Sequence, residues 1–352
     1  ILHTFKAAFL EQYGDRLLPG HRKALQAMAN CRSSASPRML AQCPDCAHQT
    51  LVPHSCGHRN CPHCQSHESQ QWLERQLARQ VPAEYFLVTF TLPAELRSLA
   101  WQHQRTLYGA MIRSSWEALK TFAQNDRQLG GTAGAVAVLH THARDLRYHP
   151  HVHVVIPAAT IDPKTRLWYT KSGYLFNHTA LAQVFRAKLL DAISQAELQL
   201  PARYPKRWVV DCTSVGTGHQ ALVYLGRYLY KGVIQESNIL AYDQDTVTYR
   251  YQDSKTKQWQ IRTVPGAQFL WLVLQHVLPR GFRRARNFGF LHPNSKRLLT
   301  LLQVLFGLDP RRALGWLRPR PVLTCACCGT PMKIIRTRLR AAYRSPSAGP
   351  AG

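Results

Sequence analysis

Residues 149–156 read His-Pro-His-Val-His-Val-Val-Ile, a pattern typical of a β-strand that carries imidazoles at alternate positions. Because side chains alternate between the two faces of a strand, His151 and His153 point to one side, and Val152 and Val154 point to the other. The valines can pack in a core, while the two imidazoles, roughly 7 Å apart along the strand, form half of a divalent-metal site. This stretch therefore predicts a strand of the core sheet with a metal centre on one face.

A third metal ligand is expected from a neighbouring strand. Residues 136–142 alternate in the same way and lie a short connection away, so antiparallel pairing would bring His140 or His142 beside the pair. We favour His140, because it still lies within the apolar alternation, whereas His142 lies nearer the loop. His149 points to the same face and could serve as a ligand, a base or a phosphate contact. Three imidazoles leave coordination positions open, as Lewis-acid chemistry on a substrate requires.

Two tyrosines lie one turn apart on a helix predicted over residues 219–233. Tyr224 and Tyr228 are at i and i+4, so both hydroxyl groups emerge from the same helix face. Aromatic residues at this spacing are most often core residues, but beside a metal-binding strand they are candidate nucleophiles for a phosphodiester. A phenol bonded to phosphorus can later be displaced by a DNA 3′-hydroxyl, so strand transfer needs no ATP. On the same helix, Arg227 and Lys231 are expected to contact DNA.

The charge balance predicts a polyanionic partner. The 352 residues include 45 Lys and Arg against 19 Asp and Glu, a net charge of +26, and nucleic acid is the default explanation. Membrane binding is the rival, but the longest apolar run, residues 269–278, is interrupted by Gln275 and His276 and does not predict a span. The scarcity of carboxylates also disfavours nucleases whose metals are held by Asp and Glu, because hard cations prefer oxygen ligands.

Residues 31–64 lose the hydrophobic periodicity and predict a small domain held together by metal. Two Cys-x-x-Cys pairs, fourteen residues apart, have the spacing of one closed four-thiolate zinc site: Cys43, Cys46, Cys61 and Cys64. Cys31 and Cys56 are left over as thiolates for a possible second zinc. A further pair, Cys325 and Cys328, has no matching partner pair in the sequence. Such pairs without a secretory signal favour a reducing compartment, so we expect a cytoplasmic, nucleoid-associated protein.

Residues 280–290 interleave arginines with three phenylalanines and two glycines. Arginines can bind phosphates while aromatic rings stack on unpaired bases, a combination suited to single-stranded DNA. The alternative is a basic loop whose phenylalanines fill the core. The arginines expected to bind DNA are Arg280, Arg283, Arg284 and Arg286.

Taken together, the His-hydrophobe-His strand and the downstream Tyr-x-x-x-Tyr helix resemble the HUH class of single-strand DNA endonucleases. Within that class the chain is most similar to the two-tyrosine rolling-circle transposases of bacterial insertion sequences, with an N-terminal zinc-binding domain. The segments that carry the resemblance are 55–64, 88–93, 139–141, 149–153, 224–228 and 275–282. The resemblance implies Mg²⁺ or Mn²⁺ on His151 and His153, and 5′-phosphotyrosyl links through Tyr224 and Tyr228.

The expected architecture is α+β, with a zinc-knuckle module, an antiparallel sheet flanked by helices, and a basic helical C-terminal region. Apolar spacing predicts one helix over residues 1–30. The expected domains are a helical and zinc-binding module that binds DNA (1–80), an HUH endonuclease domain (81–265), a basic helical DNA-binding region (266–335) and a disordered basic tail (336–352).

The leading functional prediction is a transposase that cleaves and rejoins single-stranded DNA at transposon ends and target. Alternatives with the same chemistry are a rolling-circle replication initiator and a relaxase. Two further alternatives are a non-catalytic zinc-dependent DNA-binding protein, and a metallohydrolase in which the tyrosines are structural. Intact His151, His153 and Tyr228 argue against the non-catalytic reading.

Overall fold

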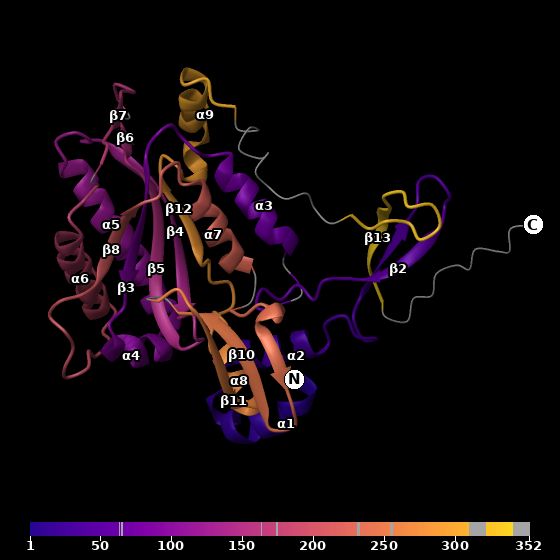
Figure 1. Ribbon diagram of the computed structural model, residues 1–352. Coiled ribbons are helices and arrows are strands. Elements are labelled where there is room, and N and C mark those ends of the chain that lie inside the picture. Colours follow the sequence, from indigo (N-terminus) through magenta and orange to yellow (C-terminus); the bar gives the residue numbers. More distant parts are fainter. Residues whose placement is uncertain are drawn as a thin grey trace, which may run out of the picture.

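The computed structural model describes residues 1–62, 64, 66–162, 164–173, 175–230, 233–253, 256–309 and 322–340, without the side chains of residues 66–67 and 227–230. Within these residues an antiparallel sheet forms the centre of an α+β fold (Figure 1). Its strand order is β7-β6-β4-β5-β3-β8, and β12 pairs with β4. The strands are β3 (Tyr85–Thr91), β4 (Thr132–His142), β5 (Tyr148–Pro157), β6 (Ala159–Ile161), β7 (Trp168–Thr170), β8 (Val210–Ser214) and β12 (Ala285–Gly289).

Helices cover both faces of this sheet (Figure 1). On one face, Val152 and Val154 share a core with α4 (Arg97–Gln102), α5 (Gln104–Asn125) and α6 (His178–Gln195). On the other face, Val155 shares a core with α3 (Ser66–Leu77), α7 (His219–Tyr230) and α9 (Lys296–Leu305). Because side chains alternate along β5, His151 and His153 lie on the same face as Val155, toward α3 and α7.

A second unit joins the N-terminal helices to a smaller sheet. α1 (Leu2–Tyr13), α2 (Pro19–Ala29) and α8 (Gly266–Leu274) share a core with a sheet of order β11-β10-β9. Its strands are β9 (Ile239–Tyr242), β10 (Thr246–Gln252) and β11 (Trp259–Pro265). The single helix predicted over residues 1–30 is wrong, because a 3-10 turn at Gly14–Arg16 separates α1 from α2. Pro19 fits the first turn of α2 but would break the interior of a longer helix.

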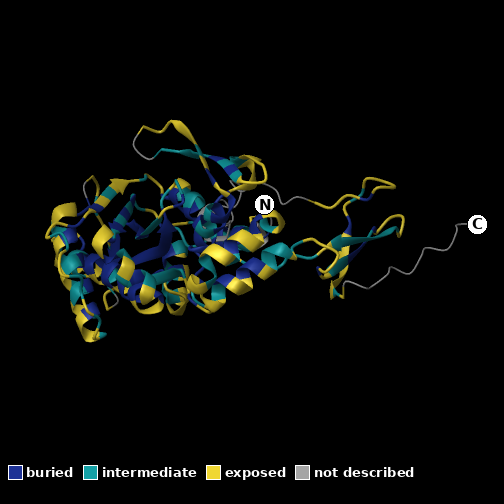
Figure 2. Ribbon diagram, turned by 90° about the horizontal axis from the view of Figure 1, so that it is seen from below, coloured by how far each residue is buried: buried dark blue, intermediate teal, exposed yellow. Residues whose placement is uncertain are grey.

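A third unit joins an N-terminal hairpin to a strand near the C-terminal end of the described residues. β1 (Arg38–Gln42) pairs with both β2 (Gln49–Pro53) and β13 (Lys333–Leu339) in the order β13-β1-β2. In Figure 1 the yellow β13 lies beside this indigo hairpin, away from the large sheet. Figure 2 shows that this unit is mostly half-buried or exposed, with little interior of its own.

The described residues of the expected basic helical region, 266–309 and 322–335, are divided among the three units. α8 packs in the N-terminal unit, β12 pairs with β4 in the large sheet, and β13 pairs with β1. The expected tail over 336–352 begins inside β13, and residues 341–352 lie outside the described residues.

Short 3-10 turns also cover Ala94–Leu96, Glu236–Asn238 and Pro293–Ser295. Among the described residues, no helix combines the length and apolar character needed to cross a membrane.

Candidate active site and cysteine clusters

Three histidines from two adjacent strands converge on one face of the large sheet. Antiparallel pairing sets His140 of β4 opposite His151 of β5, while His153 lies opposite Val138. The ring centroids of His140 lie 5.3 Å from His151 and 4.6 Å from His153. One ligand nitrogen from each ring lies within 4.8 Å of the other two. The structure therefore brings together the three residues that the sequence predicts as a metal-binding group.

Hydrogen bonds orient two of these rings. His151 Nδ1 lies 2.7 Å from the carbonyl oxygen of His149, which can only accept, so Nδ1 carries the proton and Nε2 keeps the lone pair. His153 Nδ1 lies 3.0 Å from Thr89 Oγ1 on β3, the residue directly opposite it in the sheet. Metal-binding histidines are commonly held in this way by a partner on the other ring nitrogen.

Burial keeps the group neutral. It lowers the pKa of His140 and His151 well below the usual value, and the neighbouring imidazoles lower both further. Burial lowers the pKa of His153 to about 4, although Asp211 acts in the opposite direction. Neutral imidazole is the form that binds metal ions, so the site presents three competent ligands.

Tyr224 lies beside the histidines on the same face of the sheet. Its ring centroid is 6.1 Å from that of His153 and 6.4 Å from that of His140. Helix α7 holds Tyr224 there by packing on α3, where Ser69 Oγ donates a 2.6 Å hydrogen bond to the carbonyl oxygen of Gly226. Tyr228 follows one turn later on α7. Its side chain, that of Arg227 and all of Lys231 lie outside the described residues.

His142 and His149, the other histidines considered from the sequence, are not part of the group. A register irregularity separates His142 from His140, and the His142 ring lies 5.4 Å from that of His276 instead. His149 Nδ1 lies 2.6 Å from Nη2 of Arg97 and accepts its hydrogen bond. Two further residues at the site, Thr89 and Asp211, lie opposite each other on β3 and β8 and carry no signal in the sequence pattern that marks them as functional. Strand alternation alone could place Thr89 on a face, but only the pairing register brings it to His153.

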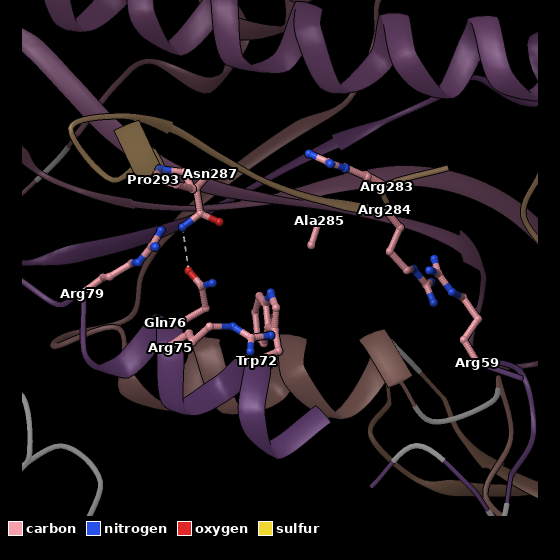
Figure 3. Close-up of a pocket in the computed structure, with 10 residues that line it drawn as sticks. All are labelled: Arg59, Trp72, Arg75, Gln76, Arg79, Arg283, Arg284, Ala285, Asn287 and Pro293. Atoms are coloured by element: carbon pink, nitrogen blue, oxygen red, sulfur yellow. Dashed lines mark hydrogen bonds between the residues drawn. The ribbon is translucent and has the colours of Figure 1, made fainter. Parts of the chain in front are cut away.

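An arginine-rich pocket of about 350 Å³ opens between α3 and β12 (Figure 3). Ala285 and Asn287 of β12 pair with Val138 and Val136 of β4, which alternate onto the same face of the sheet as His140. The pocket therefore lies on the same side of the sheet as the histidines. Asn287 Nδ2 donates a 2.8 Å hydrogen bond to Gln76 Oε1 across it. The lining residues are Arg59, Trp72, Arg75, Gln76, Arg79, Arg283, Arg284, Ala285, Asn287 and Pro293.

The four arginines predicted to bind DNA occupy different places. Arg283 and Arg284 line the pocket, and Arg284 Nε donates to the carbonyl oxygen of Leu139, next to His140. Arg280 is exposed. Arg286 is half-buried beneath the ring of Phe282, with its guanidinium carbon 5.6 Å from the ring centroid.

The phenylalanines of this segment belong to the protein interior. Phe282 and Phe290 are buried, and Phe288 stacks on Trp116 with centroids 5.0 Å apart. The alternative interpretation of residues 280–290, in which the phenylalanines fill the core, is therefore the one that the structure supports. The rings of Phe282 and Phe290 are not available for stacking on bases, and the ring of Phe288 is already stacked on Trp116.

The cysteines form two groups of four, which corrects the grouping predicted from the sequence. Cys61 and Cys64 lie with Cys31 and Cys56, whereas Cys43 and Cys46 lie with Cys325 and Cys328. The β1–β2 hairpin explains the separation. Cys43 and Cys46 lie in its turn. β2 then runs antiparallel to β1, and at its end the amide of His54 donates a hydrogen bond to the carbonyl oxygen of Pro37, on the side of Cys31. Five-residue strands span about 17 Å, too far for one ion.

Comparison with known proteins agrees with this architecture. Residues 134–298 match a family model described as "Putative transposase", and residues 1–92 match one described as "Transposase zinc-binding domain". The "Putative transposase y4qJ" of Sinorhizobium fredii is 32% identical over 315 residues, which cover 83% of this chain and 79% of that protein. The transposase for insertion sequence element IS801 of Pseudomonas savastanoi pv. phaseolicola is 29% identical over 264 residues. That match covers 70% of this chain and 63% of the IS801 protein.

Among solved structures, the conjugative relaxase TrwC in complex with oriT DNA is 14% identical, with a TM-score of 0.27. The match covers 64% of this chain and 72% of that chain, and a similarity this low supports no inference.

The fold, the histidine group beside a tyrosine helix, and the zinc-binding module define a DNA transposase. The chain belongs to the two-tyrosine rolling-circle (HUH) transposases of bacterial insertion sequences, with an N-terminal zinc-binding domain.

Proposed function

We propose that this transposase cleaves and rejoins single-stranded DNA at the ends of its mobile element, with Tyr224 and Tyr228 as nucleophiles. The observation that carries the proposal is the position of the Tyr224 ring. Its centroid lies 6.1 Å from that of the His153 ring, on the same face of the sheet as all three histidines. A phenolic oxygen and the histidine nitrogens can thus approach one phosphodiester together.

The histidine group suits a catalytic metal ion. Its three imidazoles are neutral, two are oriented by hydrogen bonds, and their ligand atoms lie within 4.8 Å of one another. His140, His151 and His153 would hold Mg²⁺ or Mn²⁺. When bound, the ion would polarise the scissile phosphate and stabilise the charge that develops on it.

In the proposed reaction, the oxygen of Tyr224 forms a bond to phosphorus and the bond to the 3′ oxygen of the DNA breaks. The phenol loses its proton and the departing 3′ oxygen gains one, so the products are a 5′-phosphotyrosine and a free 3′-hydroxyl. Attack by another 3′-hydroxyl reverses these changes and releases the tyrosine, which conserves the energy of the cleaved bond. Tyr228, one turn further along α7, supplies a second nucleophile for another DNA end.

We further propose that the arginine-rich pocket holds the backbone of the DNA strand near the histidines. Five arginines line it, and one of them, Arg284, also bonds to the backbone next to His140. Each phosphate bound by an arginine releases counterions, so binding should weaken with salt.

The proposed function is tested with an end-labelled single strand that spans a junction between the element end and flanking DNA. In the presence of Mn²⁺, we expect an adduct between protein and DNA that resists denaturation. Tyr224→Phe should reduce the adduct strongly, and the Tyr224→Phe/Tyr228→Phe double variant should abolish it. Tyr242→Phe, which changes an exposed tyrosine on β9, is the matched control. A hydrolysed product without any adduct would contradict the proposal and support a metallohydrolase.

A further inference from the structure

Two Cys-x-x-Cys turns from opposite ends of the chain meet in the three-stranded unit. Cys43 and Cys46 lie in the β1–β2 turn, and Cys325 and Cys328 lie before β13. The Cys43 and Cys328 Sγ atoms are 3.4 Å apart, and those of Cys46 and Cys325 are 3.5 Å apart. All four sulfurs lie within 4.8 Å of one another.

The two turns repeat the same backbone geometry. In each, the amide of the first cysteine donates to the carbonyl oxygen five residues later: Cys43 to His48 at 2.8 Å, and Cys325 to Thr330 at 2.9 Å. The residue after the second cysteine has a positive φ in both, 56° at Ala47 and 74° at Gly329. Two matching Cys-x-x-Cys turns that face each other supply the four thiolates of a closed tetrahedral zinc site.

The sulfur separations distinguish a metal site from disulfides. Sulfurs bound to zinc at 2.3 Å in a tetrahedron lie about 3.8 Å apart, whereas disulfide sulfurs lie about 2.05 Å apart. The separations of 3.4–3.6 Å in this group are near the tetrahedral value.

Among the described residues, this unit has little hydrophobic core of its own. Its cluster of buried apolar residues consists of Ala41, Cys43, Cys325 and Met332, so half of it is ligand side chains. So small a core cannot hold three strands, and small units of this kind depend on a metal for folding.

We propose that Cys43, Cys46, Cys325 and Cys328 bind one structural Zn²⁺, and that this ion fastens the C-terminal segment into the N-terminal zinc-binding module. The residues that match the zinc-binding family model, 1–92, would then contain only half of this site's ligands. β13 would be an integral strand of the module, paired with β1 from Arg38 opposite Leu339 to Gln42 opposite Lys333.

Zinc stoichiometry of purified variants tests the proposal without any measurement of DNA cleavage. The unmodified protein should contain two zinc ions per chain by elemental analysis. Cys325→Ser/Cys328→Ser should retain one, and Cys325→His/Cys328→His should restore two, because histidine also binds zinc. Cys327→Ser, which changes the neighbouring cysteine outside the group, should retain two. Two zinc ions in Cys325→Ser/Cys328→Ser would overturn the proposal.

Crossed double variants test which cysteines share an ion. Cys46→Ser/Cys325→Ser should lose one zinc, since both belong to the same site, whereas Cys46→Ser/Cys61→Ser should lose both. The grouping predicted from sequence gives a different result, in which the Cys46→Ser/Cys61→Ser variant loses only the one ion that these two cysteines would share.

A measurement on the unmodified protein does not depend on whether the variants fold. Cys46 and Cys328 are exposed, so burial cannot shield their thiols from an alkylating reagent. We expect both to resist alkylation until a chelator removes the zinc, while the exposed Cys327 reacts in either state. Immediate alkylation of Cys46 and Cys328 before chelation, or a disulfide found within the group, would overturn the proposal.

Discussion

The histidine group and the cysteine groups both gather metal-binding side chains, but the molecule builds them in opposite ways. His140, His151 and His153 lie on adjacent strands of a sheet with a hydrophobic core on each face. Packing and strand register position these ligands, so the site can exist before any ion binds. The group Cys43, Cys46, Cys325 and Cys328 lies in a unit with almost no core, where an ion must supply the stability.

We propose that this difference separates a metal used for chemistry from a metal used for folding. Three histidines leave coordination positions open to a phosphate, whereas four thiolates close the coordination sphere. We therefore expect exchange of the ion at the histidines to alter activity with little effect on the fold. Loss of zinc from the cysteines should alter the fold first.

The largest expected effect comes from chelation of the ion at the three histidines, which is expected to be the more weakly held of the two kinds. Brief treatment with EDTA should abolish adduct formation without lowering the zinc content, because the closed thiolate sites release zinc slowly. Addition of Mn²⁺ should restore adduct formation fully. Adduct yield and zinc content are measured on the same samples. Activity that returns only when Zn²⁺ is added would contradict the distinction between the two kinds of site.

His153→Ala should reduce the cleavage rate by about 10²- to 10³-fold, the loss typical when one group that stabilises charge in the transition state is removed. The melting temperature should change little, since the surrounding cores remain. His103→Ala, at an exposed histidine outside the group, is the matched control and should cleave normally. A His153→Ala enzyme that cleaves at the normal rate would show that His153 binds no catalytic metal.

Thr89→Val tests whether the hydrogen bond to His153 positions that ring. Partners of this kind typically affect metal affinity by about 10- to 100-fold. We expect the Mn²⁺ concentration for half-maximal cleavage to rise by about that factor, with a nearly normal rate at saturating Mn²⁺. A lower rate at every Mn²⁺ concentration would instead indicate general damage to the site. Thr263→Val on β11, outside the large sheet, should leave the Mn²⁺ dependence unchanged.

Arg75→Gln tests the pocket as a DNA-binding surface. We expect weaker binding of a single-stranded oligonucleotide and a slope of log affinity against log salt that is shallower by about 0.7, the value for one phosphate contact on a single strand. Arg297→Gln, at an exposed position on α9 outside the pocket, should leave the slope unchanged. An unchanged slope in Arg75→Gln would place the DNA elsewhere.

The smallest expected effect is that of Ser69→Ala, which removes the hydrogen bond between α3 and α7. It should lower the free energy of unfolding by about 1 kcal/mol, and lower the cleavage rate a few-fold because α7 carries Tyr224. Ser115→Ala removes a buried hydroxyl that bonds within α5, and should lower stability without slowing cleavage. Equal cleavage rates in the two variants would show that the α3–α7 contact does not position Tyr224.

Much of the histidine site could be predicted from the sequence because its determinants are local. Alternation with a period of two places His151 and His153 on one face, and a short connection makes the pairing with His140 the simplest one. Helical spacing likewise predicts the α7 segment that carries Tyr224. Local periodicity also located every strand of the large sheet that lies between residues 85 and 156.

The partition of the cysteines was decided only by the tertiary structure. The ligand pairs of the group at the ends of the chain are separated by 279 to 285 residues, a distance over which sequence spacing carries no information about contact. The same reason applies to Thr89, which reaches His153 through strand register, and to the pocket, where α3 and β12 meet across the fold. Local chemistry indicated most of the candidate metal ligands, and long-range pairing of strands decided which of them lie together.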